Sequence, residues 1–470
     1  MFLLVLLSAC AKPATHAEIR FAIAQAPLTL DPRYATDAAS ERVIRLLYQP
    51  LVDFDAHFRA VPALASWQVK TPTWYRFTLS QTGREFHDGS RLTAADVAET
   101  YASLLALKDS PHTAEFSNIL EVKAVDNDIV DFTLKQSDED FPAKLIIGIL
   151  PAKLIAQQHD FSHKPVGSGA LKFVDWQRNL KLQRVADAQA IVLEEVKDPT
   201  VRVLKLLRGE ADLLQGDLPP ELVGYLKQQA NIKVLENAGT NYSYLGFNLQ
   251  DPVLKNPLVR RAVALSINRE AMIKHAMVGG TRLATAILPP EHWAGNTELQ
   301  PYAYDPQLAK KLLQQAGIKL PLKLVYKTST DAQRVRLATV MQAQMREAGI
   351  ELEIRSLDWG TFFDDVKHGQ FQLFGLTWVG IKTPEIYAKA FHSQMMPPAG
   401  ANRGRLQDVE LDQLLDKHDW KSATVRVHEL LPYVPLWYEG QFAAVRSDTR
   451  GYAPATDGNW DGLVVVTKHY

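Results

Sequence analysis

Two tryptophans, Trp359 and Trp378, are the side chains best suited to contact a ligand, because an indole combines a large apolar face with one N–H donor. Each stands at the end of a predicted strand. Ile350–Leu357 alternates apolar and polar residues, as a half-buried strand does, and Trp359 follows it. Phe371–Leu376 is a more continuous apolar run, which predicts a more buried strand ending at Trp378. The spacing therefore predicts two indoles at the ends of two strands.

The residues between these strands predict a short helix. Asp358 can cap its start and Gly369 can end it. Its apolar stripe comprises Phe362, Phe363 and Val366. A strand, a helix and a strand in so few residues imply a right-handed crossover between parallel strands, so both indoles lie at the carboxyl edge of one sheet. Ligands of open α/β sheets bind along that edge. Packing explains either tryptophan alone, but two at one edge favour a wall of a binding site.

Further strands and helices precede this stretch. Tyr242–Leu249 predicts a buried strand, with Tyr242 and Asn248 as candidates for polar contacts to a ligand near its end. Period and capping residues predict helices at Pro257–Ile267, Arg269–Met277 and Asp331–Ala348. A further helix is predicted with Asp305 as its N-cap and Pro306 as its first residue, ending before Gly317, and Leu322–Tyr326 predicts a strand. The region from Tyr242 to Trp378 is therefore expected to be βαβαβ, with a mostly parallel sheet.

Three other motifs could carry chemistry but are better explained as structure. His87-Asp88 has no nucleophile in view and adjoins an Asp-Gly turn, so turn scaffolding is favoured over a catalytic pair. His159 and His163 have a spacing that could chelate a metal on a helix, but the residues between them look like a loop and no third ligand is evident. The glycine-rich segment 165–169 precedes a strand, whereas a phosphate cradle needs a helix there. It is a structural turn, or a place where the backbone approaches a ligand. No metal site, cofactor or catalytic residue is predicted.

Composition limits the class of protein. The chain has 470 residues, 46% of them hydrophobic and 22% charged, with a formal net charge of −1. This length predicts two or more domains. The near-neutral charge argues against nucleic acid as the main partner. The single cysteine, Cys10, excludes an internal disulfide and a cysteine-based zinc site.

The start of the chain has the pattern of a bacterial lipoprotein signal. Phe2–Leu7 is an apolar run, and Ser8 and Ala9 are small residues before Cys10, whose thiol would carry the lipid. The run is short, and it lacks the Lys or Arg that precedes the apolar run of a signal peptide. Cys10 could instead be a buried thiol, but the pattern favours lipidation. Ala11–Glu18 is expected to be a linker.

Six segments carry a resemblance to a known family: LTLDPRYATDAASERVIRLLYQPLV (Leu28–Val52), YRFTLSQTGREFHDGSRLTAADV (Tyr75–Val97), PVGSGALKFVDW (Pro165–Trp176), YLGFNLQDPVLKNPLVRRAVALSINRE (Tyr244–Glu270), YDPQLAKKLLQQAGI (Tyr304–Ile318) and YVPLWYEG (Tyr433–Gly440). They resemble, in the same order, segments of the family 5 extracellular solute-binding proteins, the receptors of bacterial oligopeptide, dipeptide and nickel ABC importers. The first begins at Leu28 and the last ends at Gly440, so together they span nearly the whole chain after the predicted signal.

The resemblance implies a type II periplasmic-binding-protein-like fold: two α/β lobes with a hinge, plus an inserted extra domain. The implied divisions are 1–17 for signal and linker, 18–50, 163–238 and 438–470 for a discontinuous domain I, 51–162 for inserted domain II and 239–437 for domain III. It also implies a non-enzymatic monomer in the periplasm or cell envelope, held to the membrane only by its lipid. Ligand closes the lobes, and the closed form docks on the membrane permease.

The resemblance also suggests a ligand site, with one departure. Family peptide binders have tryptophans matching Trp359 and Trp378, and an Asp soon after the second one pairs with the peptide α-ammonium. Here Ile381 or Lys382 stands near that place. A buried ammonium without a carboxylate is costly, so an ordinary free-amino peptide is in doubt. Lys382 could prefer an anionic group, or it could be a solvated loop lysine. The expected ligand is a peptide or peptide-like solute; a metal or haem receptor of the same fold is the alternative, and an exported hydrolase is a weaker one.

Overall fold

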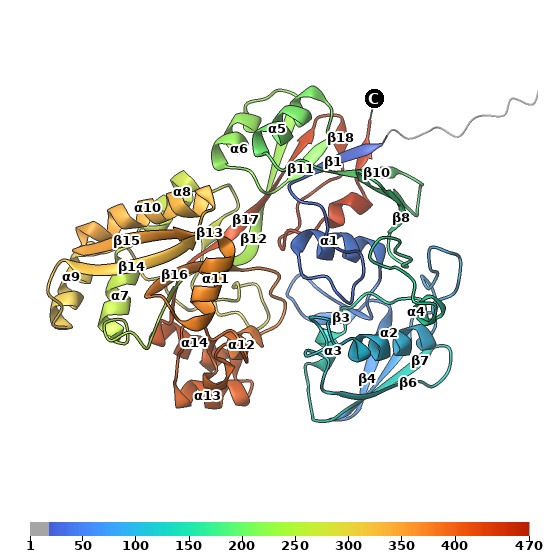
Figure 1. Cartoon of the computed structure of the whole chain (residues 1–470), viewed down its shortest axis with the longest axis horizontal. Coiled ribbons are helices and arrows are strands. Elements are labelled where there is room, and N and C mark those ends of the chain that lie inside the picture. The colour runs from blue at the N-terminus through green and yellow to red at the C-terminus, as the bar shows by residue number, and fades with distance from the viewer. Residues whose placement is uncertain (1–17, 470) are drawn as a thin grey trace, which may run out of the picture.

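The computed structural model describes residues 18–469, so Cys10 and the predicted signal lie outside the described residues. Two α/β lobes lie side by side, and an extra domain adjoins the first lobe (Figure 1). One eleven-stranded sheet runs through both lobes in the order β15-β14-β16-β12-β17-β11-β1-β10-β9-β8, with β13 paired to β17. The predicted fold class is confirmed.

The first lobe has helices on both faces of its part of the sheet. Its strands are β1 (Ile19–Ile23), β8 (Leu171–Trp176), β9 (Leu180–Arg184), β10 (Ala190–Glu195) and β11 (Leu213–Gln215). Its helices are α1 (Ala38–Leu47), α5 (Pro199–Arg208) and α6 (Pro220–Lys227). In β1, Ile19 and Phe21 face the core that contains α1, whereas Ala22 faces the core that contains α5 and α6. This alternation is the two-residue period of a strand covered on both faces.

The end of the chain returns to the first lobe. β18 (Thr449–Arg450), η2 (Asp461–Val464) and β19 (Thr467–Lys468) lie there. Trp460 packs edge-on against Phe21, with 5.0 Å between ring centroids, and Leu463 is fully buried in the same core. Residues near Trp460 therefore move with the first lobe.

The extra domain has a four-stranded antiparallel sheet, a separate two-stranded antiparallel sheet and its own apolar core. Its elements are β2 (Val52–Phe54), β3 (Ala60–Pro62), β4 (Ala65–Thr71), β5 (Trp74–Leu79), α2 (Ala94–Ala106), β6 (Ile119–Ala124), β7 (Ile129–Leu134), α3 (Phe141–Lys144) and α4 (Ala152–Ala156). Thr93 and Asp96 form a capping box at the start of α2, as their spacing predicts. Tyr101 on α2 meets Phe132 edge-on, at 5.3 Å between centroids.

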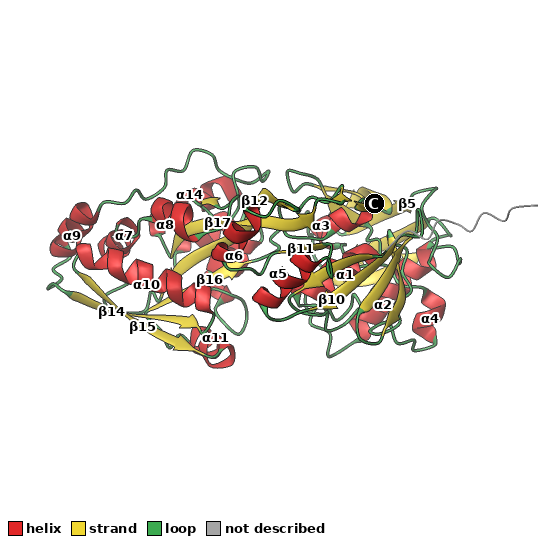
Figure 2. Cartoon of the chain, turned by 90° about the horizontal axis from the view of Figure 1, so that it is seen from above, coloured by secondary structure: helices red, strands yellow, loops and turns green. Residues whose placement is uncertain are grey.

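The second lobe also carries helices on both faces of its strands (Figure 2). Its three parallel strands are β14 (Leu322–Ser329), β15 (Ile350–Leu357) and β16 (Leu373–Trp378). One face is covered by α7 (Pro257–Leu265), α8 (Arg269–Ala276), α9 (Pro306–Gln315) and α10 (Ala332–Glu347). The other is covered by α11 (Trp359–His368), α12 (Ile386–Phe391), α13 (Val409–Asp416) and α14 (Trp420–Leu430). The short elements are β13 (Arg282–Leu283) and η1 (Ser393–Met395).

The predicted strand, helix and strand around Trp359 is present, and β15 and β16 are parallel. β14 lies between them, so the crossover through α11 passes one strand. The strand that begins this region, β12 (Ile232–Phe247), runs antiparallel to β16, with Tyr242 opposite Trp378 and Phe247 opposite Leu373. In the region from Tyr242 to Trp378, the sheet is therefore parallel only over β14, β15 and β16.

Two long strands join the lobes. β12 and β17 (Tyr433–Arg446) pair in the first lobe through residues such as Val234 and Ala444, and in the second through residues such as Leu245 and Val434. Their pairing is irregular between Asn237 and Asn241, where the strands pass between the lobes. The domain boundaries placed at 238 and 437 fall within these strands and stay a prediction.

Candidate functional site

A cavity of about 370 Å³ lies between the two lobes. The first lobe contributes Arg42 on α1 and the segment Gln215–Leu218 after β11. The second lobe contributes residues of β12, β16, β17 and α10. Ligand sites of small solutes have volumes of roughly 300–1,000 Å³. A cavity built from both lobes can recognise a solute only when the lobes are together.

Three strands bring a carboxylate and two hydroxyls together in this cavity. Glu439 Oε1 on β17 accepts hydrogen bonds from Ser243 Oγ on β12, at 2.5 Å, and from Thr377 Oγ1 on β16, at 3.0 Å. Glu439 and Ser243 line the cavity, and Thr377 lies between Leu376, which also lines it, and Trp378. Strands position a polar group more rigidly than loops do.

A guanidinium completes this network from α10. Arg334 lines the cavity, and its Nη2 donates to Thr377 Oγ1 at 3.3 Å. Asp331 caps α10 by accepting from the Arg334 backbone N–H at 2.9 Å, which fixes the first turn. Burial raises the pKa of Tyr326, another lining residue, to about 12, so its hydroxyl remains a proton donor at neutral pH. The second lobe therefore offers the cavity a strand-held carboxylate and a guanidinium close together, with hydroxyls beside them.

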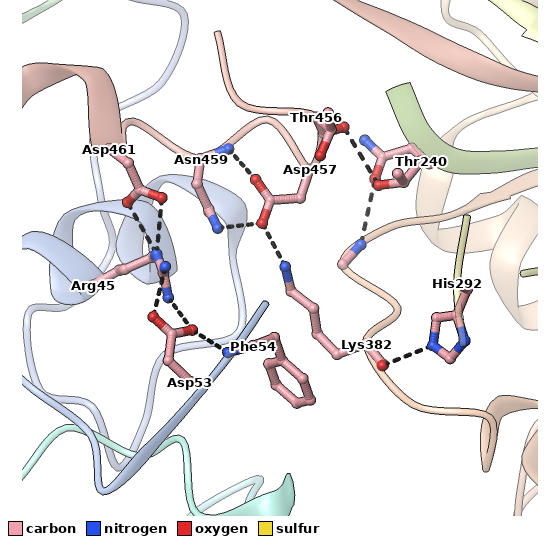
Figure 3. Close-up of polar contacts among 12 residues, drawn as sticks. Arg45, Asp53, Phe54, Thr240, His292, Lys382, Thr456, Asp457, Asn459 and Asp461 are labelled. Atoms are coloured by element: carbon pink, nitrogen blue, oxygen red, sulfur yellow. Dashed lines mark hydrogen bonds and ion pairs between the residues drawn. The ribbon is translucent and has the colours of Figure 1, made fainter. Parts of the chain in front are cut away.

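Polar contacts join the two lobes (Figure 3). Lys382, in the loop after β16, reaches Asp457 of the first lobe, at 2.5 Å between Nζ and Oδ2. Burial alone would raise the pKa of Asp457, but the Lys382 ammonium and the backbone N–H of Asn459 hold it below its ordinary value. The backbone N–H of Thr240 donates to the Thr456 carbonyl at 3.1 Å.

A second pair joins the lobes beside the cavity. Arg336 on α10 and Glu221 on α6 form an ion pair, and each adjoins a lining residue, Leu337 and Pro220 respectively. Both side chains remain about half exposed. Lys382 and Asp457, by contrast, are 24% and 15% exposed.

The predicted tryptophans lie at the same edge of the sheet but do not line the cavity. Trp359 is 56% exposed and stacks on Phe363, with ring centroids 5.4 Å apart. The Arg403 guanidinium lies 5.3 Å from the Phe363 ring and 4.7 Å from the Trp378 ring. The two indoles are thus linked through Phe363 and Arg403, and the half-buried Trp378 has an indole N–H without an acceptor among the described residues.

The other two predicted residues are placed away from this group. Tyr242 is 1% exposed and packs with Tyr244 and Tyr438 in the core on the α12 and α14 side. Asn248 follows the far end of β12, opposite the start of β16, because the two strands are antiparallel. Its amide donates to the carbonyls of Gly369 and Phe371. Both side chains therefore serve the packing of the lobe in this structure, and neither faces the cavity.

The residues of the polar network were not singled out from the sequence. Glu439 stands in a strand rich in aromatic residues, and a single carboxylate in such an apolar run is the sequence feature that indicates a functional polar residue. Thr377 directly precedes Trp378, and its alternate position on the strand points it to the opposite face.

The remaining motifs serve as structure. His87 donates its backbone N–H to the Gly167 carbonyl, and its Nε2 lies 3.0 Å from the Gly169 carbonyl oxygen. Both glycines approach the end of α1 so closely that an added Cβ would overlap backbone atoms of Leu46 or Leu47. The 165–169 segment is therefore a close-packed turn. Within residues 18–469 no group of three or more His, Cys, Asp or Glu side chains is placed to hold a metal ion.

Comparisons with known proteins agree with this architecture. A model of the bacterial extracellular solute-binding proteins, family 5, matches residues 59–394. The dipeptide-binding protein of Escherichia coli is 24% identical, and the alignment covers 86% of each protein. Heme-binding protein A of Haemophilus influenzae is 26% identical, covering 95% of this chain and 92% of that one. The periplasmic binding protein DppA of Helicobacter pylori, solved in complex with the peptide STSA, has a TM-score of 0.78 at 25% identity, covering 97% of this chain and 99% of that one.

Proposed function

Because the chain belongs to the bacterial extracellular solute-binding proteins of family 5, we propose that it captures a peptide or peptide-like solute between its lobes and delivers it to the membrane permease of an ABC importer. The observation that carries the proposal is the cavity of about 370 Å³, to which both lobes contribute polar side chains. The relatives named for dipeptide and peptide binding support this class of solute.

The arrangement of the lobes explains how capture would work. Arg42 and Gln215 come from one lobe, and Arg334 and Glu439 come from the other. A solute that contacts all four has its full set of contacts only in the closed form, so binding shifts the population toward closure. The two strands between the lobes can bend at the irregular pairing near Asn241. The permease would then recognise the closed form.

We also propose a role for the two tryptophans as an outer wall of the site. Trp378 follows Thr377, whose hydroxyl bonds Glu439, and Arg403 links Trp378 to the Phe363 ring on which Trp359 stacks. A solute longer than the cavity would pass over these rings at the carboxyl edge of the sheet. Indole faces suit such a contact because they are large and rigid.

The protein is proposed to act in the periplasm as a monomer that does not bind nucleic acid and performs no catalysis. We propose a lipid at Cys10 as its only attachment to the membrane. None of the helices in residues 18–469 has the length and apolar character needed to cross a bilayer.

The direct test is to identify what the protein carries. Protein purified from its native host is denatured, and the released solutes are identified by mass spectrometry. The same protein is then titrated calorimetrically with dipeptides and tripeptides, while small-angle scattering follows its radius. We expect a released or added peptide-like solute to bind and to make the protein more compact. Release of haem alone, seen by its visible absorption, would instead favour the haem receptor, and the failure of every peptide to bind would overturn the proposal.

A further inference from the structure

Glu439 lies in the cavity between the lobes, and its carboxylate has no cationic partner among the described residues. Its Oε1 accepts from Ser243 and Thr377, and its Oε2 has no hydrogen-bond partner among residues 18–469. No Lys, Arg or His nitrogen of those residues lies within 4.0 Å of it, as an ion pair would require. An ionised group held between two lobes without a partner is costly.

Several other carboxylates between or beside the lobes have a cationic partner. Asp457 pairs with Lys382, Glu221 pairs with Arg336, and Glu291 pairs with Arg282. Asp217, which lines the same cavity from the first lobe, is exposed to water. Glu385 is half-buried and, among the described residues, has no ion-pair partner, but it does not line the cavity. Glu439 is thus distinguished by being half-buried, held in place, without a cation and in the cavity.

We propose that Glu439 is the anchor for the cationic group of the bound solute, which is therefore a small molecule with a protonated amine or a guanidinium. The inference rests on the proposed function, since it identifies the solute that the inter-lobe cavity takes. The two hydroxyls hold Oε1, and Oε2 is left to accept a charge-assisted hydrogen bond. Because β12, β16 and β17 each contribute one of the three side chains, the acceptor is in place before the solute arrives.

Arg334 extends the description of the solute. Its Nη2 donates to the same Thr377 hydroxyl that donates to Glu439, so the guanidinium and the carboxylate lie on the two sides of one hydroxyl. No carboxylate oxygen of the described residues lies within 4.0 Å of the Arg334 guanidinium. A zwitterionic solute, with an ammonium on Glu439 and a carboxylate on Arg334, satisfies both groups at once.

The loop after β16 agrees with this placement of the anchor. The loop carries one carboxylate, Glu385, and one cation, Lys382. Glu385 does not line the cavity, and Lys382 is already paired with Asp457. The charge of Lys382 is therefore neutralised by Asp457 of the first lobe. The negative charge for a ligand cation is supplied by the strand that joins the lobes.

The test compares matched probes on the full chain by isothermal titration calorimetry. The probes are dipeptides and tripeptides with free N-termini, the same peptides with acetylated N-termini, and the amines agmatine and putrescine. We expect at least one cationic probe to bind, and its acetylated counterpart to bind at least about tenfold more weakly. Glu439→Gln should weaken binding of the cationic probe at least about tenfold. It should also bring the ratio of the affinities for free and acetylated peptide close to one.

The control variant is Glu351→Gln, which removes the same charge from an exposed position on β15 and should leave every affinity unchanged. Circular dichroism and thermal unfolding verify that Glu439→Gln is folded. Ser243→Ala, which keeps the charge and removes one of its donors, should cause a smaller loss and keep the discrimination.

The outcomes separate the anchor from the proposed function. If peptides bind but neither acetylation nor Glu439→Gln changes their affinity, the anchor is wrong and peptide capture stands. If only the amines bind and Glu439→Gln abolishes their binding, the anchor stands and peptide capture is wrong. Binding of none of the cationic probes overturns the anchor, whatever solute co-purifies.

Discussion

Two sets of charged groups between the lobes differ in how they are paired. In one set, each charge meets its partner across the gap: Lys382 meets Asp457 and Arg336 meets Glu221. In the other set, Glu439 and Arg334 face a shared cavity, and neither has an ion-pair partner among the described residues. The first set can hold the lobes together without a solute, whereas the second is complete only with one. The comparison separates closure from recognition, and substitutions can test the two separately.

Arg334 should show the largest effect, because it belongs to the unpaired set. We expect Arg334→Gln to weaken binding of a carboxylate-bearing solute about ten- to a hundredfold, since a hydrogen bond to a charged group contributes about 1.5–3 kcal/mol. Calorimetry with a free peptide and its C-terminal amide measures this. The wild type should prefer the free carboxylate, and the variant should not.

Arg336→Gln is the matched control, because it removes the same charge two residues away on the same helix, where the side chain is about half exposed and does not line the cavity. It should change the affinity less than about twofold. Equal losses in the two variants would show that Arg334 acts through the general charge of α10 and does not contact the solute.

The edge of the sheet could be predicted from the sequence, but the network within the cavity could not. Alternation around Ile350–Leu357 identifies a strand, and crossover handedness places Trp359 and Trp378 at one edge. Periodicity does not tell the direction of a distant strand, so Asn248 was expected near a ligand although β12 runs the other way. Glu439 was assigned to domain I by the boundary at 438, whereas its neighbours pair with residues 241–246 in the second lobe. The placement of both residues depends on pairing between segments far apart in the chain, which local periodicity does not specify.

The Lys382 and Asp457 pair should have the next largest effect, and it should act on closure. Lys382→Met leaves the half-buried Asp457 unpaired, and we expect it to disfavour the closed form by about 1–3 kcal/mol. Small-angle scattering of solute-free protein should show a larger radius. The double variant Lys382→Met, Asp457→Asn should recover part of this loss, because it removes the unpaired charge together with the pair.

The same contact should respond to acid. Because the pKa of Asp457 lies below its ordinary value of about 3.9, the pair contributes fully above that pH and its contribution is lost as the pH falls through the pKa of the closed form. The radius of the wild type should rise over that range more than that of the double variant. Identical acid profiles would show that this pair does not govern closure.

The tryptophan wall should give a smaller effect on binding. Trp378→Ala removes the ring under the Arg403 guanidinium and should weaken binding of a tripeptide about three- to tenfold, with less effect on a dipeptide that fits inside the cavity. Trp359→Ala removes an exposed ring farther from Thr377 and should have a smaller effect. Unchanged affinities in both variants, measured by calorimetry for both peptide lengths, would mean that the wall is wrong.

The second cross-lobe pair, Glu221 with Arg336, should have the smallest effect, although it too joins a carboxylate of one lobe to a cation of the other. Glu221 and Arg336 are 58% and 42% exposed, so water and salt compete with their attraction. Glu221→Gln should change the ratio of closed to open protein less than about twofold, and 0.5 M salt should remove even that difference. Scattering in low and high salt measures this, with Lys382→Met as the reference. If Glu221→Gln opens the protein as much as Lys382→Met does, burial is not what distinguishes the two pairs, and closure depends on the number of cross-lobe charges.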